Sequence, residues 1–219
     1  FVDGVAHELR TPISVISGHA QQLQQLAGFS GHGPVALIAA EAARMGRLLQ
    51  VLAELARSDS GRLQLVFQPH DPEDALLLAY ERLSSLASDR LQLAMPALAA
   101  LPSIQVDQDR LQQCLASFVA NASAYRAGVI ELSAESLDGH VVLHVLDHGP
   151  GIPVQERDRV IQRFQRGTTA TGSRGSGLGL ALVQQLVALM DGELRIADAE
   201  GGGADLQLWF KASGLPPVP

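Results

Sequence analysis

The sequence predicts an α+β protein in which an antiparallel helical hairpin precedes an α/β sandwich. Over the first part of the chain, apolar residues recur in alternating steps of four and three, the spacing of helices that pack in bundles. Further along, short apolar runs alternate with helical patterns. Hydrophobic residues make up 47% of the 219 residues, which is ample for a core. We expect residues 1–60 to form the hairpin, residues 61–213 a second domain and residues 214–219 a frayed tail.

Two helices form the predicted hairpin. The first carries apolar or small residues at Val2, Ala6, Leu9, Ile13, Ile16, Ala20, Leu23 and Ala27. Glycines and Pro34 then break the pattern, and the second helix repeats it at Ile38, Ala42, Met45, Leu49, Leu52 and Ala56. Because two helices alone cannot enclose a core, we expect the hairpin to dimerise into a four-helix bundle.

A polar group lies near the start of the first helix. Thr11 is one turn from His7 and on the same face, and Glu8 is adjacent to the imidazole. Pro12 cannot donate to the carbonyl of Glu8, so the helix should bend there. If Ala6 and the residue three positions later face the seam, His7 points into solvent, where a second protein can reach it. An ordinary surface histidine before a kink is the alternative.

The second domain is predicted as helices on one face of a mixed sheet. We expect strands at 63–67, 91–93, 104–106, 129–134, 140–146, 193–197 and 205–210, and helices at 73–88, 107–122, 158–164 and 177–190. Asp107 is placed to cap its helix, and Asp138-Gly139 to turn a hairpin.

Two glycine-rich loops carry the chemistry of this domain. The first, at residues 147–153, follows an apolar strand, so its Asp147 can accept a hydrogen bond from an amine while the glycines admit a flat ring. A tight turn capped by Asp147 is the alternative. The second, at residues 174–180, opens a helix whose N–H groups and dipole favour phosphate. Residues 167–173, between the loops, have the composition of a mobile lid.

Composition excludes several classes of protein. The net charge of −7 argues against binding to nucleic acid, which needs a basic face. Cys114 is the one cysteine, so an internal disulfide is excluded, and its apolar neighbours predict a buried, inert thiol. No apolar run approaches the roughly 20 residues that span a bilayer. We expect a soluble fragment of a longer protein.

With these residues in place, the chain resembles the catalytic core of a bacterial two-component sensor histidine kinase. Five motifs stand in the family's order, and together they cover nearly the whole chain. They are the H box at 7–12, the N box at 109–125, the G1 box at 147–153, the F box at 163–166 and the G2 box at 175–180. The resemblance implies a HisKA phosphotransfer domain followed by a GHKL ATPase domain with the Bergerat fold.

The resemblance also implies a role for each matching residue. His7 would accept the γ-phosphoryl group of ATP, Glu8 would fix its tautomer, and Thr11 would orient water for dephosphorylation of a response regulator. Asp147 would bind the adenine amine and Asn121 would help to hold Mg²⁺. The remaining nucleotide-binding residues implied are Tyr125, Gly149, Gly151, Arg166, Gly175, Gly177, Leu178 and Gly179.

The N box departs from the family pattern at two positions. Ser117 stands where an asparagine is usual, and Ala124 where a lysine is usual. Both changes remove polar or positive groups from the metal–phosphate side of the site, so we expect weaker ATP binding or a compensating arginine, either Arg126 or Arg163. The F box also opens with Ile161 in place of phenylalanine.

The family resemblance implies partners and a location. The core would act as a homodimer through residues 1–60 and pass phosphate to an aspartate of a response regulator chosen by Ser14, Ser17, Gly18 and Gln21. A sensor region before residue 1 would place it at the cytoplasmic face of the inner membrane. One alternative is a degenerate nucleotide-binding switch acting mainly as a phosphatase or scaffold. Another is an ATPase that uses water as the acceptor.

Overall fold

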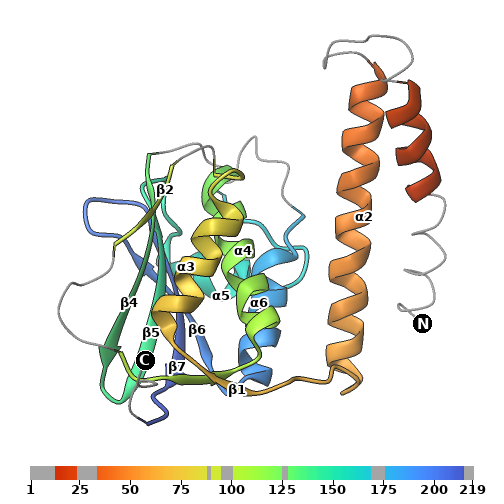
Figure 1. Ribbon diagram of the computed structural model, residues 1–219. Helices are drawn as coiled ribbons and strands as arrows, with labels where there is room; N and C mark the ends of the chain where they lie inside the picture. Colours follow the sequence, from red (N-terminus) through yellow and green to blue (C-terminus); the bar gives the residue numbers. More distant parts are fainter. Residues whose placement is uncertain are drawn as a thin grey trace. The chain divides into compact units, whose positions relative to one another are not determined.

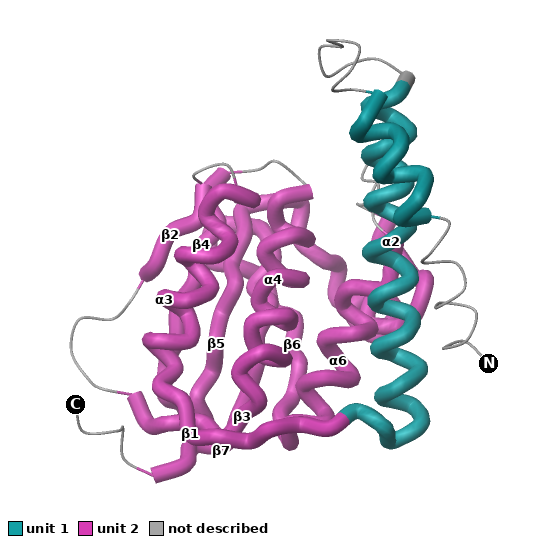
Figure 2. The backbone as a smooth tube through the Cα atoms, turned by 45° about the vertical axis from the view of Figure 1, so that its right-hand side comes forward, with its two compact units in different colours: residues 1–63 teal, residues 64–219 magenta. Residues whose placement is uncertain are grey.

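The computed structural model describes residues 13–23, 34–87, 90–94, 101–124, 128–168 and 176–214. The chain divides into two compact units, Phe1–Leu63 and Gln64–Pro219, which Figure 2 shows in different colours. This division lies close to the one that the sequence predicts at residues 60 and 61.

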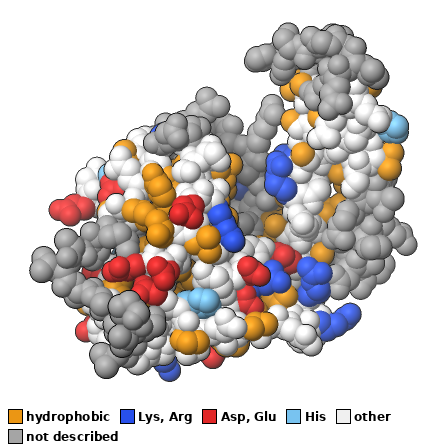
Figure 3. Space-filling view, viewed as in Figure 1, with side chains coloured by type: hydrophobic (Ala, Val, Ile, Leu, Met, Phe, Trp, Pro, Cys, Tyr) orange, Lys and Arg blue, Asp and Glu red, His pale blue; other side chains and the backbone are white. Residues whose placement is uncertain are grey.

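The first unit is a pair of helices, residues 13–23 and α2 (Pro34–Asp59), which lie side by side and run in opposite directions (Figure 1). Ile13 from the first helix packs with Ala42, Leu49 and Ala53 from α2. The predicted second helix is therefore confirmed. Six larger apolar side chains on these helices remain exposed in the single chain, and orange side chains are visible along the hairpin in Figure 3. They are Val15, Ile16, Leu23, Leu37, Ile38 and Met45.

The second unit contains a five-stranded sheet with the order β2-β4-β5-β7-β6. Its strands are β2 (Leu91–Leu93), β4 (Ile130–Leu137), β5 (His140–Asp147), β6 (Glu193–Asp198) and β7 (Ala204–Lys211). β2 is parallel to β4, and the other neighbours are antiparallel. Helices α3 (Pro72–Leu83), α4 (Gln108–Ala124) and α6 (Gly179–Leu189) cover one face (Figure 1). The predicted sandwich of helices on a mixed sheet is confirmed.

Alternation along the strands places the core between the sheet and these helices. Val141, Leu143 and Val145 of β5 are buried, as are Leu115 and Phe118 of α4. The predicted cap is present, since the backbone N–H of Arg110 donates to Oδ1 of Asp107 at 3.1 Å. Cys114 is fully buried, and this burial raises the pKa of its thiol, as expected for an inert cysteine.

Three predicted elements are misplaced or too long. The strand expected at 63–67 lies instead at β1 (Gln68–His70), which pairs with β3 (Ile104–Val106). Its predicted apolar residues Val66 and Phe67 are exposed, and the N–H of Val66 donates to Asp107 rather than to a strand.

The short helix expected at 158–164 is α5 (Val154–Val160), which begins directly after Pro153. It cannot extend to Phe164, because that residue has a φ of 64°, in the left-handed region. The helix expected at 73–88 ends at Leu83, and a turn follows.

A titratable cluster lies on the face of the sheet opposite to the helices. Nδ1 of His144 on β5 is 3.0 Å from Oδ2 of Asp205 on β7, and its Nε2 is 3.4 Å from Oε1 of Glu135 on β4. Burial lowers the pKa of His144, but the hydrogen bond and the charge of Asp205, assisted by Glu135, outweigh it and raise the pKa above its usual value.

We expect His144 to stabilise the fold more at acidic than at alkaline pH. Because its folded-state pKa is raised, its contribution is complete below the unfolded-state pKa and is lost as the pH rises through the folded-state value. In urea unfolding followed by fluorescence of Trp209, the single tryptophan, the loss of stability caused by His144→Gln should be larger at about pH 5.5 than at about pH 8.5. An equal loss at both values would contradict this.

Candidate functional site

The G1 loop begins with a buried carboxylate at the end of the central strand β5. Asp147 is 3% exposed and pairs across the sheet with Ile130. Its Oδ1 accepts the backbone N–H of Gly149 at 2.7 Å, which fixes the direction of the carboxylate. A carboxylate held in this way can use its second oxygen to accept a hydrogen bond from a ligand amine.

The turn between β6 and β7 packs against the backbone of the G1 loop. Gly201, Gly202 and Gly203 all have positive φ, and a Cβ on Gly203 would lie 1.8 Å from the carbonyl oxygen of Asp147. A Cβ on Gly151 would lie 3.0 Å from the carbonyl oxygen of Gly203. Backbone thus packs directly on backbone here. The sequence signal for this close approach is the run of three successive glycines between two strands.

An arginine from α5 joins the end of the G1 loop to the sheet. Nε of Arg157 donates to the carbonyl of Ile152 at 3.1 Å, and its Nη1 donates to the carbonyl of Ile196 at 3.0 Å. Its Nη2 also donates to Asp198. The loop is therefore held at its start by β5 and at its end by β6.

The described part of the G2 loop lies between the F box and α4. Gly177 has a φ of 69°, and its carbonyl accepts the backbone N–H of Phe164 at 2.8 Å. Leu178 is buried, and Gly179 begins α6. A Cβ on Gly179 would lie 2.8 Å from Oγ of Ser117, so the N-box serine lies against the first residue of α6.

Asn121 follows Ser117 by one turn of α4 and is half-buried. Residues four apart on a helix share a face, so Asn121 is on the side of α4 that carries Ser117. The N box therefore packs against the N-terminus of α6. Within the described residues, no group of three His, Cys, Asp or Glu side chains could hold a metal ion.

Several predicted site residues lie outside the described parts of the chain. They are His7, Glu8, Thr11, Tyr125 and Gly175, together with the candidate Arg126 and most of the predicted lid. Arg166 is described and exposed. The roles of all these residues remain predictions.

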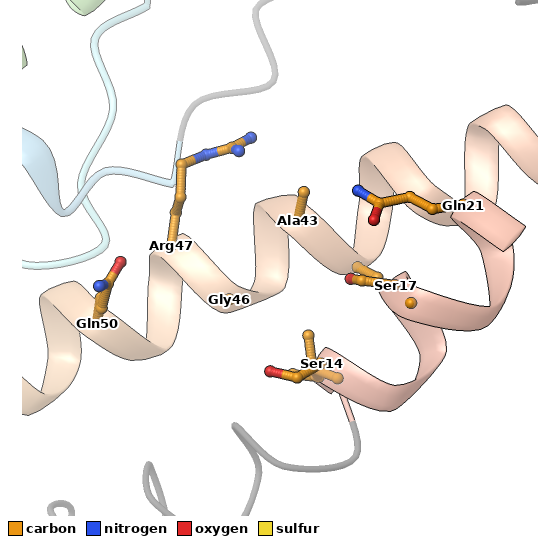
Figure 4. Close-up of a pocket in the computed structure, with 10 residues that line it drawn as sticks. Ser14, Ser17, Gln21, Ala43, Gly46, Arg47 and Gln50 are labelled. Carbon is orange, nitrogen blue, oxygen red and sulfur yellow. The ribbon is translucent and has the colours of Figure 1, made fainter.

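A separate pocket of about 440 Å³ lies between the two helices of the first unit (Figure 4). Ser14, Ser17 and Gln21 of the first helix line the pocket together with Arg47 and Gln50 of α2. Small residues keep the groove open, and they include Gly18, Ala42, Ala43 and Gly46. All four residues predicted to select a partner line this pocket.

Family models match both parts of the chain. The model described as His Kinase A (phospho-acceptor) domain matches residues 1–61, and the model described as Histidine kinase-, DNA gyrase B-, and HSP90-like ATPase matches residues 106–214. This chain belongs to the histidine kinases. Within this histidine kinase core, no helix of the described segments combines the length and hydrophobicity needed to cross a membrane.

The curated relatives of this chain include sensor histidine kinases. Sensor histidine kinase ZraS of Escherichia coli K12 is 34% identical over 212 residues, covering 94% of this chain and 44% of ZraS. Probable sensor histidine kinase TcrY of Mycobacterium tuberculosis is 33% identical, covering 92% of this chain and 43% of TcrY. The chain thus spans less than half of the length of these relatives.

Solved structures share the fold. Full-length ShkA, crystallised in complex with AMPPNP, has a TM-score of 0.78 and is 28% identical, covering 99% of this chain and 47% of ShkA. The mycobacterial sensor histidine kinase MprB has a TM-score of 0.56 and is 28% identical, covering 68% of this chain and all of that structure. The likeness to ShkA extends over both units of the histidine kinase core.

Proposed function

We propose that this chain is an ATP-dependent protein-histidine kinase, which transfers the γ-phosphoryl group to His7 and then to an aspartate of a response regulator. The fixed, buried carboxylate of Asp147 is the observation that carries the proposal. It lies in the ATPase domain of a chain that also carries the phospho-acceptor domain. A relative with the same fold, ShkA, was crystallised with the ATP analogue AMPPNP.

An adenine nucleotide would be held by residues of the G1, G2 and N boxes. Asp147 would accept a hydrogen bond from the adenine amine, and Gly149 and Gly151 would let the backbone approach the ring. Gly177, Leu178 and Gly179 would direct backbone N–H groups of the α6 N-terminus toward the phosphates, as would Gly175. Tyr125 would pack beside the nucleotide.

A magnesium ion is expected to accompany the nucleotide and to offset the charge of the triphosphate. Asn121 is the residue that would bind it, because hard cations prefer oxygen ligands and this side chain supplies an amide oxygen on the face of α4 that carries Ser117. Arg166 would approach the phosphates from the F box.

The acceptor side uses three residues of the H box. A ring nitrogen of His7 would attack the γ-phosphorus in line with the departing ADP oxygen, while Glu8 would accept the N–H of the other ring nitrogen and hold the tautomer. Thr11 would orient water for hydrolysis of the phosphoryl group on the response regulator, which would give the kinase a phosphatase activity.

The test of this function is autophosphorylation. Incubation of the chain with magnesium and γ-labelled ATP should give a phosphoryl group that is labile to acid and stable to base, and His7→Ala should lose it. Absence of label with any divalent metal would favour the degenerate switch. Label that persists in His7→Ala would identify another acceptor.

Two surfaces of the hairpin support the proposed partners. The exposed apolar residues of the two helices would be covered by a second copy of the hairpin, which would form the four-helix bundle. The pocket lined by Ser14, Ser17, Gly18 and Gln21 would receive the response regulator. Arg47 and Gln50 belong to the same pocket and extend this set to α2.

The N-box departures give a separate expectation. Ala124 is exposed at the end of α4, so a lysine at this position has room to extend. We expect Ala124→Lys to tighten ATP binding about three- to tenfold, because it adds a positive charge on the phosphate side of the site. Titration with ATP checks this, and an affinity equal to that of the parent would show that another cation already compensates.

A further inference from the structure

Two charged side chains of α5 hold the segment that returns along this helix. Oε2 of Glu156 accepts the backbone N–H of Thr168 at 2.9 Å, and Nη2 of Arg159 donates to the carbonyl of Arg166 at 3.4 Å. The same Nη2 lies 3.0 Å from Oε1 of Glu156. Glu156 and Arg159 thus bind a backbone N–H and a backbone carbonyl on the two sides of Gly167.

Glu156 is the central member of this arrangement. It is 7% exposed, whereas its neighbour Asp158 on the same helix is exposed. Hydrogen bonds from Thr168, first from its backbone N–H and then from its side chain, lower the pKa of the Glu156 carboxyl, so that it is ionised at neutral pH. A buried carboxylate and a backbone N–H both require a partner, and here each supplies the other.

The other end of this segment, at Phe164, is bonded to the G2 loop. Phe164 has a φ of 64°, which a bulky residue keeps only where its surroundings impose it, and its N–H donates to the carbonyl of Gly177 at 2.8 Å. A Cβ on Gly177 would lie 2.6 Å from the carbonyl oxygen of Gln165. Residues 164–168 are therefore bonded to the G2 loop at one end and to Glu156 at the other.

We propose that Glu156, supported by Arg159, is a positioning residue for nucleotide phosphates. Glu156 binds the backbone N–H of Thr168, and Arg159 binds the backbone carbonyl of Arg166. Together they fix the backbone from which the side chain of Arg166 extends. The inference rests on the proposed function, in which Arg166 approaches the phosphates. Glu156 itself would touch no nucleotide, so its removal should affect phosphate binding and leave recognition of adenine by Asp147 unchanged.

The experiment compares three variants of the whole chain, Glu156→Ala, Glu156→Gln and the control Asp158→Ala, for binding of ATP and of adenosine. We expect Glu156→Ala to weaken ATP binding about tenfold and adenosine binding less than about twofold. Glu156→Gln keeps a neutral acceptor for the Thr168 N–H and should recover ATP affinity to within about threefold of the parent. Asp158→Ala should match the parent. Fluorescence of Trp209 verifies that each variant is folded.

A second measurement tests the hydrogen bond between the Thr168 N–H and the Glu156 carboxylate directly. In NMR spectra of the parent, the amide resonance of Thr168 should shift with pH at the lowered pKa of Glu156, and Glu156→Gln should abolish this shift. A Thr168 amide that does not follow the carboxyl titration overturns the inference, as does equal weakening of ATP and adenosine binding in Glu156→Ala. A parent that binds no ATP overturns the proposed function. A parent and a Glu156→Ala variant that bind ATP equally overturn the inference alone.

Discussion

Gly203→Ala should destabilise the catalytic unit by at least about 3 kcal/mol. The added Cβ would lie 1.8 Å from the carbonyl oxygen of Asp147, where ordinary contact begins near 3.4 Å, so the ends of β5 and β7 would have to separate. The φ of 112° adds a conformational cost of about 1–3 kcal/mol for a residue with a side chain. Because both obstacles are backbone atoms or backbone angles, no side chain can move to relieve them.

Gly202→Ala is the matched control for this prediction. Gly202 has a φ of 100° in the same turn, but its Cβ would meet nothing within 4 Å. It should therefore show only the conformational cost, about 1–3 kcal/mol. Thermal unfolding followed by fluorescence of Trp209 should place Gly203→Ala at least about 6 °C below the parent. Equal midpoints for the two variants would show that the contact with Asp147 has no energetic weight.

Asp147→Asn should weaken ATP binding about 100-fold while leaving the fold intact. The amide oxygen of asparagine can still accept the N–H of Gly149, so the turn survives. The amide NH₂ would then occupy the position of the second carboxylate oxygen and would face the adenine amine, donor against donor. A buried site that mismatches a hydrogen-bonding partner discriminates strongly against it.

The control removes the same charge from the opposite end of the strand. Asp138 precedes β5, has a φ of 50° that asparagine also tolerates, and is exposed. Asp138→Asn should bind ATP as the parent does. Displacement of a fluorescent ATP analogue measures both affinities, and an Asp147→Asn affinity within about threefold of the parent would remove Asp147 from its proposed role.

Local patterns in the sequence predicted most elements of the fold. The periodicity of α2, α4 and α6 and the Asp138-Gly139 turn between β4 and β5 depend on residues close together in the chain, and the structure confirms all of them. The strand predicted at 63–67 was misplaced relative to β1. The apolar run does not reveal that the side chain of Asp107, which is distant in sequence, accepts a hydrogen bond from the N–H of Val66. The predicted start of α5 at residue 158 was wrong because the helix begins directly after Pro153, whose ring favours a helix start.

The candidate site was predictable only in part. Motif spacing led to Asp147, Gly149, Gly151 and Gly177, which belong to short motifs that can be recognised in the sequence. The support from Gly203, the contact of Ser117 with Gly179 and the bond from Glu156 to Thr168 all join segments that are distant in sequence or separated by a turn. Such contacts depend on the strand order and on the return of the chain, which no local pattern contains.

The pairing of β5 with β7 also bears on when the proposed nucleotide site can form during folding. Leu146 pairs with Asp205, and the backbone of Gly203 supports Asp147, so residues almost sixty positions apart complete one loop. During synthesis, β5 leaves the ribosome well before β7, and in the interval the loop lacks the support that the backbone of Gly203 provides. If ATP binds at Asp147 as proposed, the complete site would therefore be available only after β7 has paired, late in the folding of this domain.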